Sequence, residues 1–197
     1  YTEEARKDII YGCSDFVRGD GLRFHQMPVE EMEKLAARYA ELAECVRFCG
    51  FDTLLIHGGH GTLLQEFVSP RGNHRTDEFG GSLENRARFP LMVLDAIRGR
   101  VGRDLLIEYR ISGSECVPGG FRIDECIEFV KLIQDRIDII HVSAGVVREP
   151  RLRAITHPSG FLPPACNAYL AKAVRNCPDI RIPVLTLGAF LRPEQIE

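Results

Sequence analysis

The sequence lacks the features that would assign it to several classes of protein. No segment approaches the roughly 20 consecutive apolar residues of a membrane-spanning helix, and no basic segment followed by an apolar one indicates a secretory signal. No charge of one sign dominates, because 25 Lys and Arg are interspersed with 28 Asp and Glu. The chain therefore lacks the basic surface expected for binding nucleic acid or an anionic membrane, and a cytoplasmic location is the default expectation.

The seven cysteines include no C-x-x-C pair. An odd number of scattered cysteines indicates neither a disulfide framework nor a zinc site, and we interpret most of them as small buried residues in a reducing compartment. The chain starts at Tyr1 without an initiator Met and ends at Glu197 in what looks like the first turn of a helix. This pattern suggests a fragment of a longer protein.

Apolar residues follow the spacing of alternating helices and strands. Helical spacing predicts helices over residues 29–49, 83–100, 124–134 and 167–175. Pro90 is expected either to kink the second of these or to mark its real start. Nearly continuous apolar runs predict buried strands over residues 51–56, 105–111, 137–142 and 182–187. Residues 1–26 have no clean period, and we expect a loop-rich lead-in with at most one short helix.

Four alternations of strand and helix over residues 27–197 favour βαβ units and a parallel sheet covered by helices, in one α/β domain. Both a TIM (β/α)8 barrel and a doubly wound sheet satisfy this pattern. In either fold the chemistry belongs at the carboxyl ends of the strands. Candidate residues are therefore those that follow each apolar run.

The first of these strand ends is His57-Gly58-Gly59-His60. Two histidines on a glycine-rich turn can point at one ligand and donate hydrogen bonds to an oxygen that gains negative charge. A metal pair is the less favoured alternative, because no further ligands with suitable spacing follow. Two solvated loop histidines, or a phosphate-binding glycine loop outside the usual patterns, remain open.

Two further strand ends offer candidates. Arg110 ends an apolar run, where a buried guanidinium needs an anionic or carbonyl partner; a structural ion pair with Glu108 is an equal alternative. Gly188 follows the last predicted strand, where backbone N–H groups can receive a phosphate, although a simple turn glycine is also possible.

The segment from Gly50 to Gly102, with its motif "NHRTDEFGGSLENR", and the following "IEYRISGSE" closely resemble the flavin-dependent ene-reductases of the Old Yellow Enzyme family. The nearest branch is that of NADH:flavin oxidoreductases and 2,4-dienoyl-CoA reductases. The resemblance extends from about Met27 to the C-terminus. It implies an FMN-binding TIM barrel in which NAD(P)H reduces the flavin and the flavin reduces an activated alkene.

The resemblance also implies roles for individual residues. His57 and His60 match the pair that holds the substrate carbonyl oxygen, and Arg110 matches the arginine near the pyrimidine edge of the flavin. Gly188, Ala189 and Phe190 match part of the FMN phosphate site. Three arginines match positions that contact acyl substrate, the last two only loosely: Arg71, Arg148 and Arg151.

The sequence departs from the family at Thr62, where relatives usually carry a tyrosine that protonates the substrate. A threonine hydroxyl is far less acidic and is a poor general acid. A complete barrel also needs about 250 residues, so we expect an incomplete one holding about strands 4 to 7. Any iron–sulfur cysteines of this branch would lie beyond Glu197.

The leading hypothesis is an FMN-dependent oxidoreductase that uses NAD(P)H to reduce the C=C of an α,β-unsaturated carbonyl or an enoyl- or dienoyl-CoA. A flavin oxidase or demethylase on the same barrel is an alternative, which Thr62 favours. A non-catalytic barrel fragment is another alternative. Such a fragment would expose two strand edges and an apolar face and would tend to oligomerise.

Overall fold

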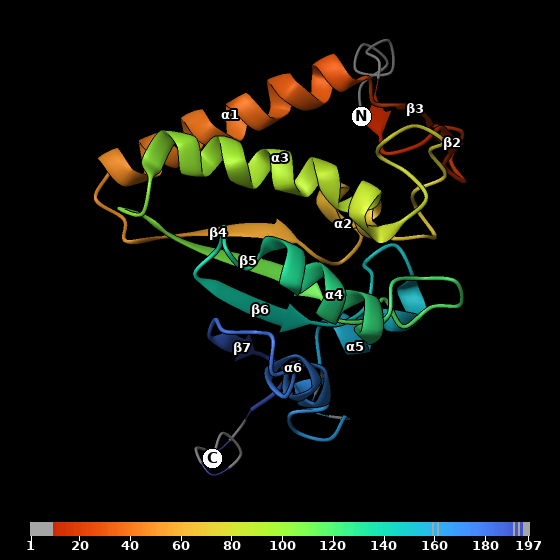
Figure 1. The fold of residues 1–197 in the computed structure, drawn as a ribbon. Coiled ribbons are helices and arrows are strands. Elements are labelled where there is room, and N and C mark those ends of the chain that lie inside the picture. The colour runs from red at the N-terminus through yellow and green to blue at the C-terminus, as the bar shows by residue number, and fades with distance from the viewer. Residues whose placement is uncertain (1–9, 159, 161, 191, 193, 195–197) are drawn as a thin grey trace.

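The computed structural model describes residues 10–158, 160, 162–190, 192 and 194. Its central sheet has four parallel strands in chain order: β4 (Thr53–Gly58), β5 (Leu106–Ser112), β6 (Ile139–Ser143) and β7 (Val184–Thr186). The helices before and between the strands are α1 (Val29–Phe48), α2 (Leu63–Val68), α3 (Leu83–Val101), α4 (Ile123–Ile133), the 3-10 helix η1 (Pro150–Leu152), α5 (Arg153–Thr156) and α6 (Ala168–Arg175). The predicted alternation of strand and helix is confirmed (Figure 1).

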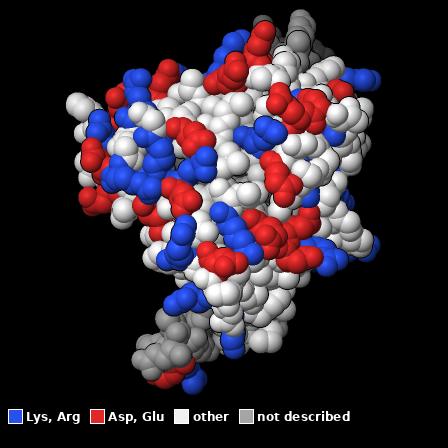
Figure 2. Space-filling model, viewed as in Figure 1, with Lys and Arg blue, Asp and Glu red and all other residues white. Residues whose placement is uncertain are grey.

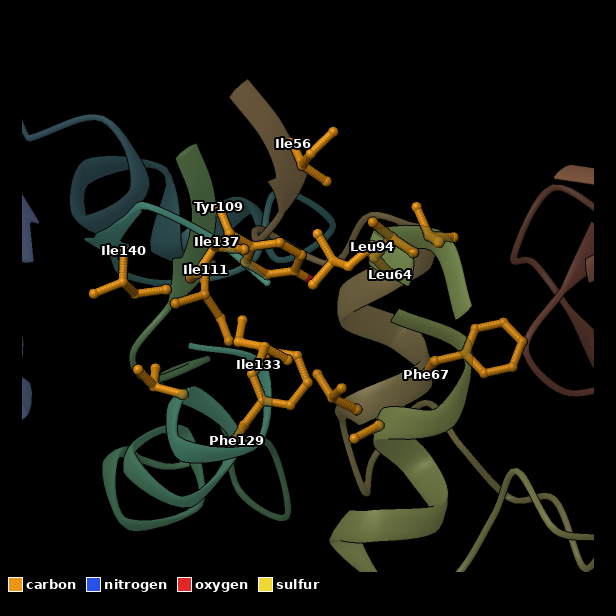
Figure 3. Close-up of a cluster of buried hydrophobic side chains, with 14 of the residues drawn as sticks. Ile56, Leu64, Phe67, Leu94, Tyr109, Ile111, Phe129, Ile133, Ile137 and Ile140 are labelled. Atoms are coloured by element: carbon orange, nitrogen blue, oxygen red, sulfur yellow. The ribbon is translucent and has the colours of Figure 1, made fainter. Parts of the chain in front are cut away.

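One face of the sheet is packed against the helices. Successive side chains of a strand point to opposite faces, and those of Ile56, Tyr109 and Val142 join a single apolar core with residues of α1, α3, α4 and α6. Helices α1 and α3 lie side by side over this core (Figure 1). Figure 3 shows the Tyr109 ring among the aliphatic and aromatic side chains of this cluster, such as Phe129.

The opposite face of the sheet is polar at its centre. His57, Arg110 and His141 are register partners across β4, β5 and β6, so their side chains form one row, which we call the lumen row. Leu55 and Leu185 on the same face are 44% and 41% exposed. Inward-facing residues alternate with outward ones along every strand of a barrel, and this face is the one that a barrel would turn toward its interior.

The lead-in before α1 differs from the prediction. Its described part contains no helix but three short strands, β1 (Tyr11–Gly12), β2 (Phe16–Val17) and β3 (Arg23–Gln26), with β3 in the middle. The Phe16 and Phe24 rings stack with centroids 4.3 Å apart. Strands of two to four residues are too short to show alternation in the sequence. Residues 1–9, and the helix expected at Glu197, lie outside the described residues.

Two other expectations need correction. Pro90 does not mark a helix start, because α3 begins at Leu83, where the Ser82 side chain accepts a hydrogen bond from the Asn85 N–H at 3.4 Å. Of the seven free cysteines, only Cys13 and Cys126 are buried; the other five are partly or fully exposed. Among the described helices, none is long and apolar enough to cross a membrane. Charges of both signs are interspersed on the face shown in Figure 2, as the sequence predicts.

Candidate functional site

The two histidines lie together at the carboxyl end of β4. The strand continues through His57, which therefore belongs to the lumen row, while His60 lies on the turn that follows with a positive φ of 58°. The His60 N–H donates to Ser112 Oγ at 2.9 Å, and His60 Nε2 lies 2.6 Å from Ser143 Oγ. The two ring centroids are 5.1 Å apart. The structure thus brings the pair together, with the His60 backbone held from β5 and its ring held from β6.

Both histidine rings are neutral at neutral pH. Burial, and then the positive charge of Arg110, lower the pKa of His60 to about 3, and the same two causes lower the pKa of His57. A neutral imidazole offers one N–H donor and one acceptor nitrogen. His57 Nδ1 is buried and has no hydrogen-bond partner among the described residues.

The glycines between the histidines serve the packing of the protein itself. A Cβ on Gly58 would lie 2.2 Å from Tyr109 Oη, because the tyrosine ring fills the space beside this glycine. A Cβ on Gly59 would lie 3.0 Å from the Ser112 backbone nitrogen. At these two glycines, the atoms that come close to the backbone therefore belong to β5 and its core side chain Tyr109, and not to a ligand.

The Thr62 hydroxyl is engaged in the turn that precedes α2. Its Oγ1 lies within donating distance of two backbone oxygens, 3.1 Å from His57 O and 2.9 Å from Gly59 O. A hydroxyl has one proton to donate, and here that proton closes the turn. We expect Thr62 to be a poor general acid for this reason too, because its hydroxyl proton is already donated to a backbone carbonyl.

Arg110 has no carboxylate partner among the described residues. The ion pair with Glu108 that the sequence left open is not formed, because Glu108 Oε1 lies 2.5 Å from His141 Nδ1 instead. Within the described part of the chain, the Arg110 guanidinium has one long hydrogen bond, 3.5 Å from Nη2 to Ser143 Oγ, and its buried Nε is unpartnered. The arginine is held at the strand ends without being neutralised by a direct contact.

Gly188, Ala189 and Phe190 follow β7, whose carboxyl end lies at the same edge of the sheet. Gly188 and Ala189 have φ values of 137° and 53°, in the region that favours glycine. The Gly188 carbonyl accepts a hydrogen bond from the Ala165 N–H at 2.9 Å. The three residues thus lie where the sequence placed them.

A cavity of about 300 Å³ lies beside the histidine turn, between the lead-in and the loops after β4, β5 and β6. Arg71 and Arg148 both line it, whereas Arg151 lies exposed on η1 outside it. Arg71 Nη2 lies 2.7 Å from Glu149 Oε1, and Arg148 Nη1 lies 2.6 Å from Glu66 Oε1.

The cavity is acidic on balance. Asp15, Glu66, Glu115 and Glu149 line it beside the two arginines, both of which are paired. Burial raises the pKa of Glu66 and of Glu115. An incoming anion would have to displace a carboxylate from an arginine.

His141 is a site residue to which the sequence analysis assigned no role, as are Ser112 and Ser143. It lies within an apolar run, "IIHVS", and was counted as part of a buried strand. The signal that could have found it is alternation, since it lies two residues before Ser143 and therefore on the same face. Among the described residues, no group of three or more His, Cys, Asp or Glu side chains could hold a metal ion.

Residues 12–192 match the model of the NADH:flavin oxidoreductase / NADH oxidase family. The chain is 33% identical to an NADH oxidase of Thermoanaerobacter brockii over 178 residues, which are 90% of this chain and 27% of that protein. The chain thus spans little more than a quarter of that relative.

Solved structures give the same picture. A 2-naphthoyl-CoA reductase in complex with 2-naphthoyl-CoA matches with a TM-score of 0.84 at 26% identity, over 93% of this chain and 28% of that one. Histamine dehydrogenase from Rhizobium sp. 4-9 matches with a TM-score of 0.83 at 28% identity, over 96% and 27% of the two chains. The parallel sheet and its helices form part of a TIM barrel, as predicted. The chain belongs to the NADH:flavin oxidoreductase / NADH oxidase family, the Old Yellow Enzyme family that its motifs resemble.

Proposed function

We propose that this chain supplies the strand-end residues of an FMN-dependent oxidoreductase that uses NAD(P)H to reduce the activated C=C of an α,β-unsaturated carbonyl or enoyl-CoA. The supporting observation is the lumen row, in which His57 Nδ1, Arg110 Nε and His141 Nε2 are all buried and unpartnered among the described residues. An unpaired buried polar atom costs about 1–3 kcal/mol. Three in one row are the pattern expected where a polar ligand completes the hydrogen bonding.

The residues present fit FMN. Arg110 would hold the pyrimidine edge of the ring, where a fixed cation favours the anionic reduced form. The backbone of Gly188, Ala189 and Phe190 would hold part of the phosphate site at the same edge of the sheet. When bound, FMN supplies hydride transfer from NAD(P)H to the substrate carbon.

His57 and His60 would bind the substrate carbonyl oxygen. A preorganised N–H donor stabilises the negative charge that develops on this oxygen in the transition state. Ser112 holds the His60 backbone and Ser143 contacts the His60 ring before substrate arrives. The proton for the neighbouring carbon would come from water or another group, since the Thr62 hydroxyl already donates within its own turn.

A fluorescence titration of FMN with this chain tests the proposal. We expect wild type to quench the flavin and Arg110→Leu to bind it at least about tenfold more weakly, because a charged hydrogen bond contributes about 1.5–3 kcal/mol. Arg122→Leu is the matched control, since Arg122 is exposed and its ion-pair partner among the described residues is Asp124. A wild-type chain that never quenches FMN would contradict the proposal and favour the non-catalytic alternative.

Two variants test the substrate residues in flavin-loaded protein. His57→Ala combined with His60→Ala should weaken binding of a phenol, seen as loss of its charge-transfer absorbance, because both donors to the phenolate oxygen are gone. An unchanged band would exclude the oxyanion role. Thr62→Tyr should speed alkene reduction if a missing proton donor limits it, and an unchanged rate would remove that explanation.

Oxidation of an amine on the same barrel is the second candidate, and the acidic cavity favours it. A CoA thioester brings several phosphate charges, whereas Arg71 and Arg148 are already paired with carboxylates. A cationic substrate would need no such displacement, and histamine dehydrogenase is among the similar structures. Reduction of the flavin by histamine but not by NADH, with no reoxidation of the reduced flavin by crotonyl-CoA, would select this candidate over the first.

A further inference from the structure

Glu108 is the acidic neighbour of two basic side chains of the lumen face. It precedes Arg110 by two residues on β5, so both side chains point to the same face of the sheet. His141 lies opposite Arg110 on β6. The Glu108 and His141 side chains are 16% and 10% exposed, and Glu108 Oε1 lies 2.5 Å from His141 Nδ1.

The pair between Glu108 and His141 leaves the Arg110 guanidinium without a hydrogen-bonded carboxylate among the residues that the structure describes. A carboxylate within reach of a guanidinium readily forms a strong, often bidentate, pair, and burial lowers the pKa of Arg110 while the charge of Glu108 raises it. Glu108 and Arg110 form no hydrogen bond or ion pair with each other; Glu108 contacts His141, and Arg110 contacts Ser143. The negative charge of Glu108 therefore acts on Arg110 at a distance, while the guanidinium N–H groups stay available to bind another group.

We propose that His141 is a positioning residue that holds Glu108 away from Arg110 and so keeps the guanidinium free to bind an anionic group at the strand ends. The inference rests on the proposed function, in which that group is the pyrimidine edge of FMN. In this arrangement the Nδ1–H of His141 donates to Glu108, and the role needs only this donor. A side chain without a donor would release Glu108 toward Arg110.

Variants at positions 108 and 141 test this role through FMN affinity and through the reduction potential of bound FMN. His141→Leu should weaken FMN binding about tenfold and lower the potential, because Glu108 would then neutralise Arg110. His141→Gln, which keeps an N–H donor, should bind within about threefold of wild type. His25→Leu on the exposed strand β3 is the matched control and should bind as wild type does.

The double variant separates positioning from a merely structural effect. Removing the Glu108 charge in His141→Leu/Glu108→Gln should restore both affinity and potential toward wild type, since nothing remains to neutralise Arg110. If His141 only supported packing, the double variant would bind FMN no better than His141→Leu. That result would overturn the proposal.

A crystal structure of His141→Leu without flavin gives a test that does not depend on the cofactor. We expect a Glu108 carboxylate oxygen within hydrogen-bond distance of the Arg110 guanidinium, and a pair that stays apart would overturn the inference. If wild type binds no FMN but the variant forms this new pair, the proposed function fails while the positioning role stands. Circular dichroism on both variants checks that they are folded.

Discussion

Gly58→Ala is a substitution whose effect on stability follows directly from the structure. The added Cβ would lie 2.2, 2.3 and 2.5 Å from three atoms of the Tyr109 ring, whereas ordinary contacts begin at 3.4 Å. The ring would have to move by about 1 Å, and it has no free space, because Tyr109 is fully buried and its ring packs 5.9 Å from that of Phe129.

Overpacking of a core typically costs about 1–3 kcal/mol, and we expect Gly58→Ala to lie at the upper end of this range. With a urea slope of about 2 kcal/mol/M, a loss of about 3 kcal/mol lowers the unfolding midpoint by roughly 1.5 M. Circular dichroism during urea titration measures the midpoint.

Two further variants make the result specific. Gly99→Ala is the matched control, because a Cβ at this position within α3 meets no atom within 4 Å, and it should stabilise the helix by about 0.5–1 kcal/mol. Gly58→Ala/Tyr109→Leu removes the overlapping ring and should recover part of the loss. If Gly58→Ala unfolds at the wild-type midpoint while Gly99→Ala shows its increase, the packing of β4 against Tyr109 is wrong.

Three other predictions concern buried polar groups. Tyr109→Phe should leave the urea midpoint unchanged or raise it, because the hydroxyl is buried without a partner among the described residues; a clear decrease would reveal a missing partner. Asn73→Asp should cost about 2–4 kcal/mol in thermal unfolding, since a carboxylate cannot donate to the carbonyls of Phe67 and Phe79, which the amide contacts at 2.7 Å. An unchanged Tm would count against that role. His60→Gln should lose less stability on acidification than wild type. The pKa of His60 is about 3 in the folded state and 6.5 in the unfolded state. Between these two values the unfolded state binds more protons, so the stability of wild type falls as the pH decreases. Parallel pH profiles for wild type and variant would contradict this.

The sequence predicted the order of the elements but placed the strand ends less accurately. Strand β4 was predicted to end at Ile56, yet its pairing with β5 continues through His57 and Gly58. The apolar run stops where the lumen-facing histidine begins, so a criterion based on apolar residues loses the last part of each strand whose inward face is polar. Helix α2 was missed because six residues are too few to show a helical period.

The motif that identifies the family builds the scaffold. The Asn73 amide joins Phe67 and Phe79, and Arg75 donates to the carbonyls of Cys13 and Met27 at 3.0 and 2.9 Å. These contacts fix the connection from α2 to α3 and tie it to the lead-in. None of the motif residues belongs to the lumen row, so the motif specifies the barrel more directly than the substrate.

The chemistry of the site depends on strand register, which no local motif encodes. His141 faces the lumen only because β6 pairs with β5 so that it lies opposite Arg110. A shift of one residue would bring Ile140 to the lumen and turn the histidine into the helix-packed core. Its partner Glu108 precedes Arg110 by two residues, on the same face of β5. The pair can be recognised only when the register of the two strands is known. Residues that adjust a flavin site from the strands are therefore to be sought by alternation from a recognised strand-end residue, here from Arg110 back to Glu108 and from Ser143 back to His141.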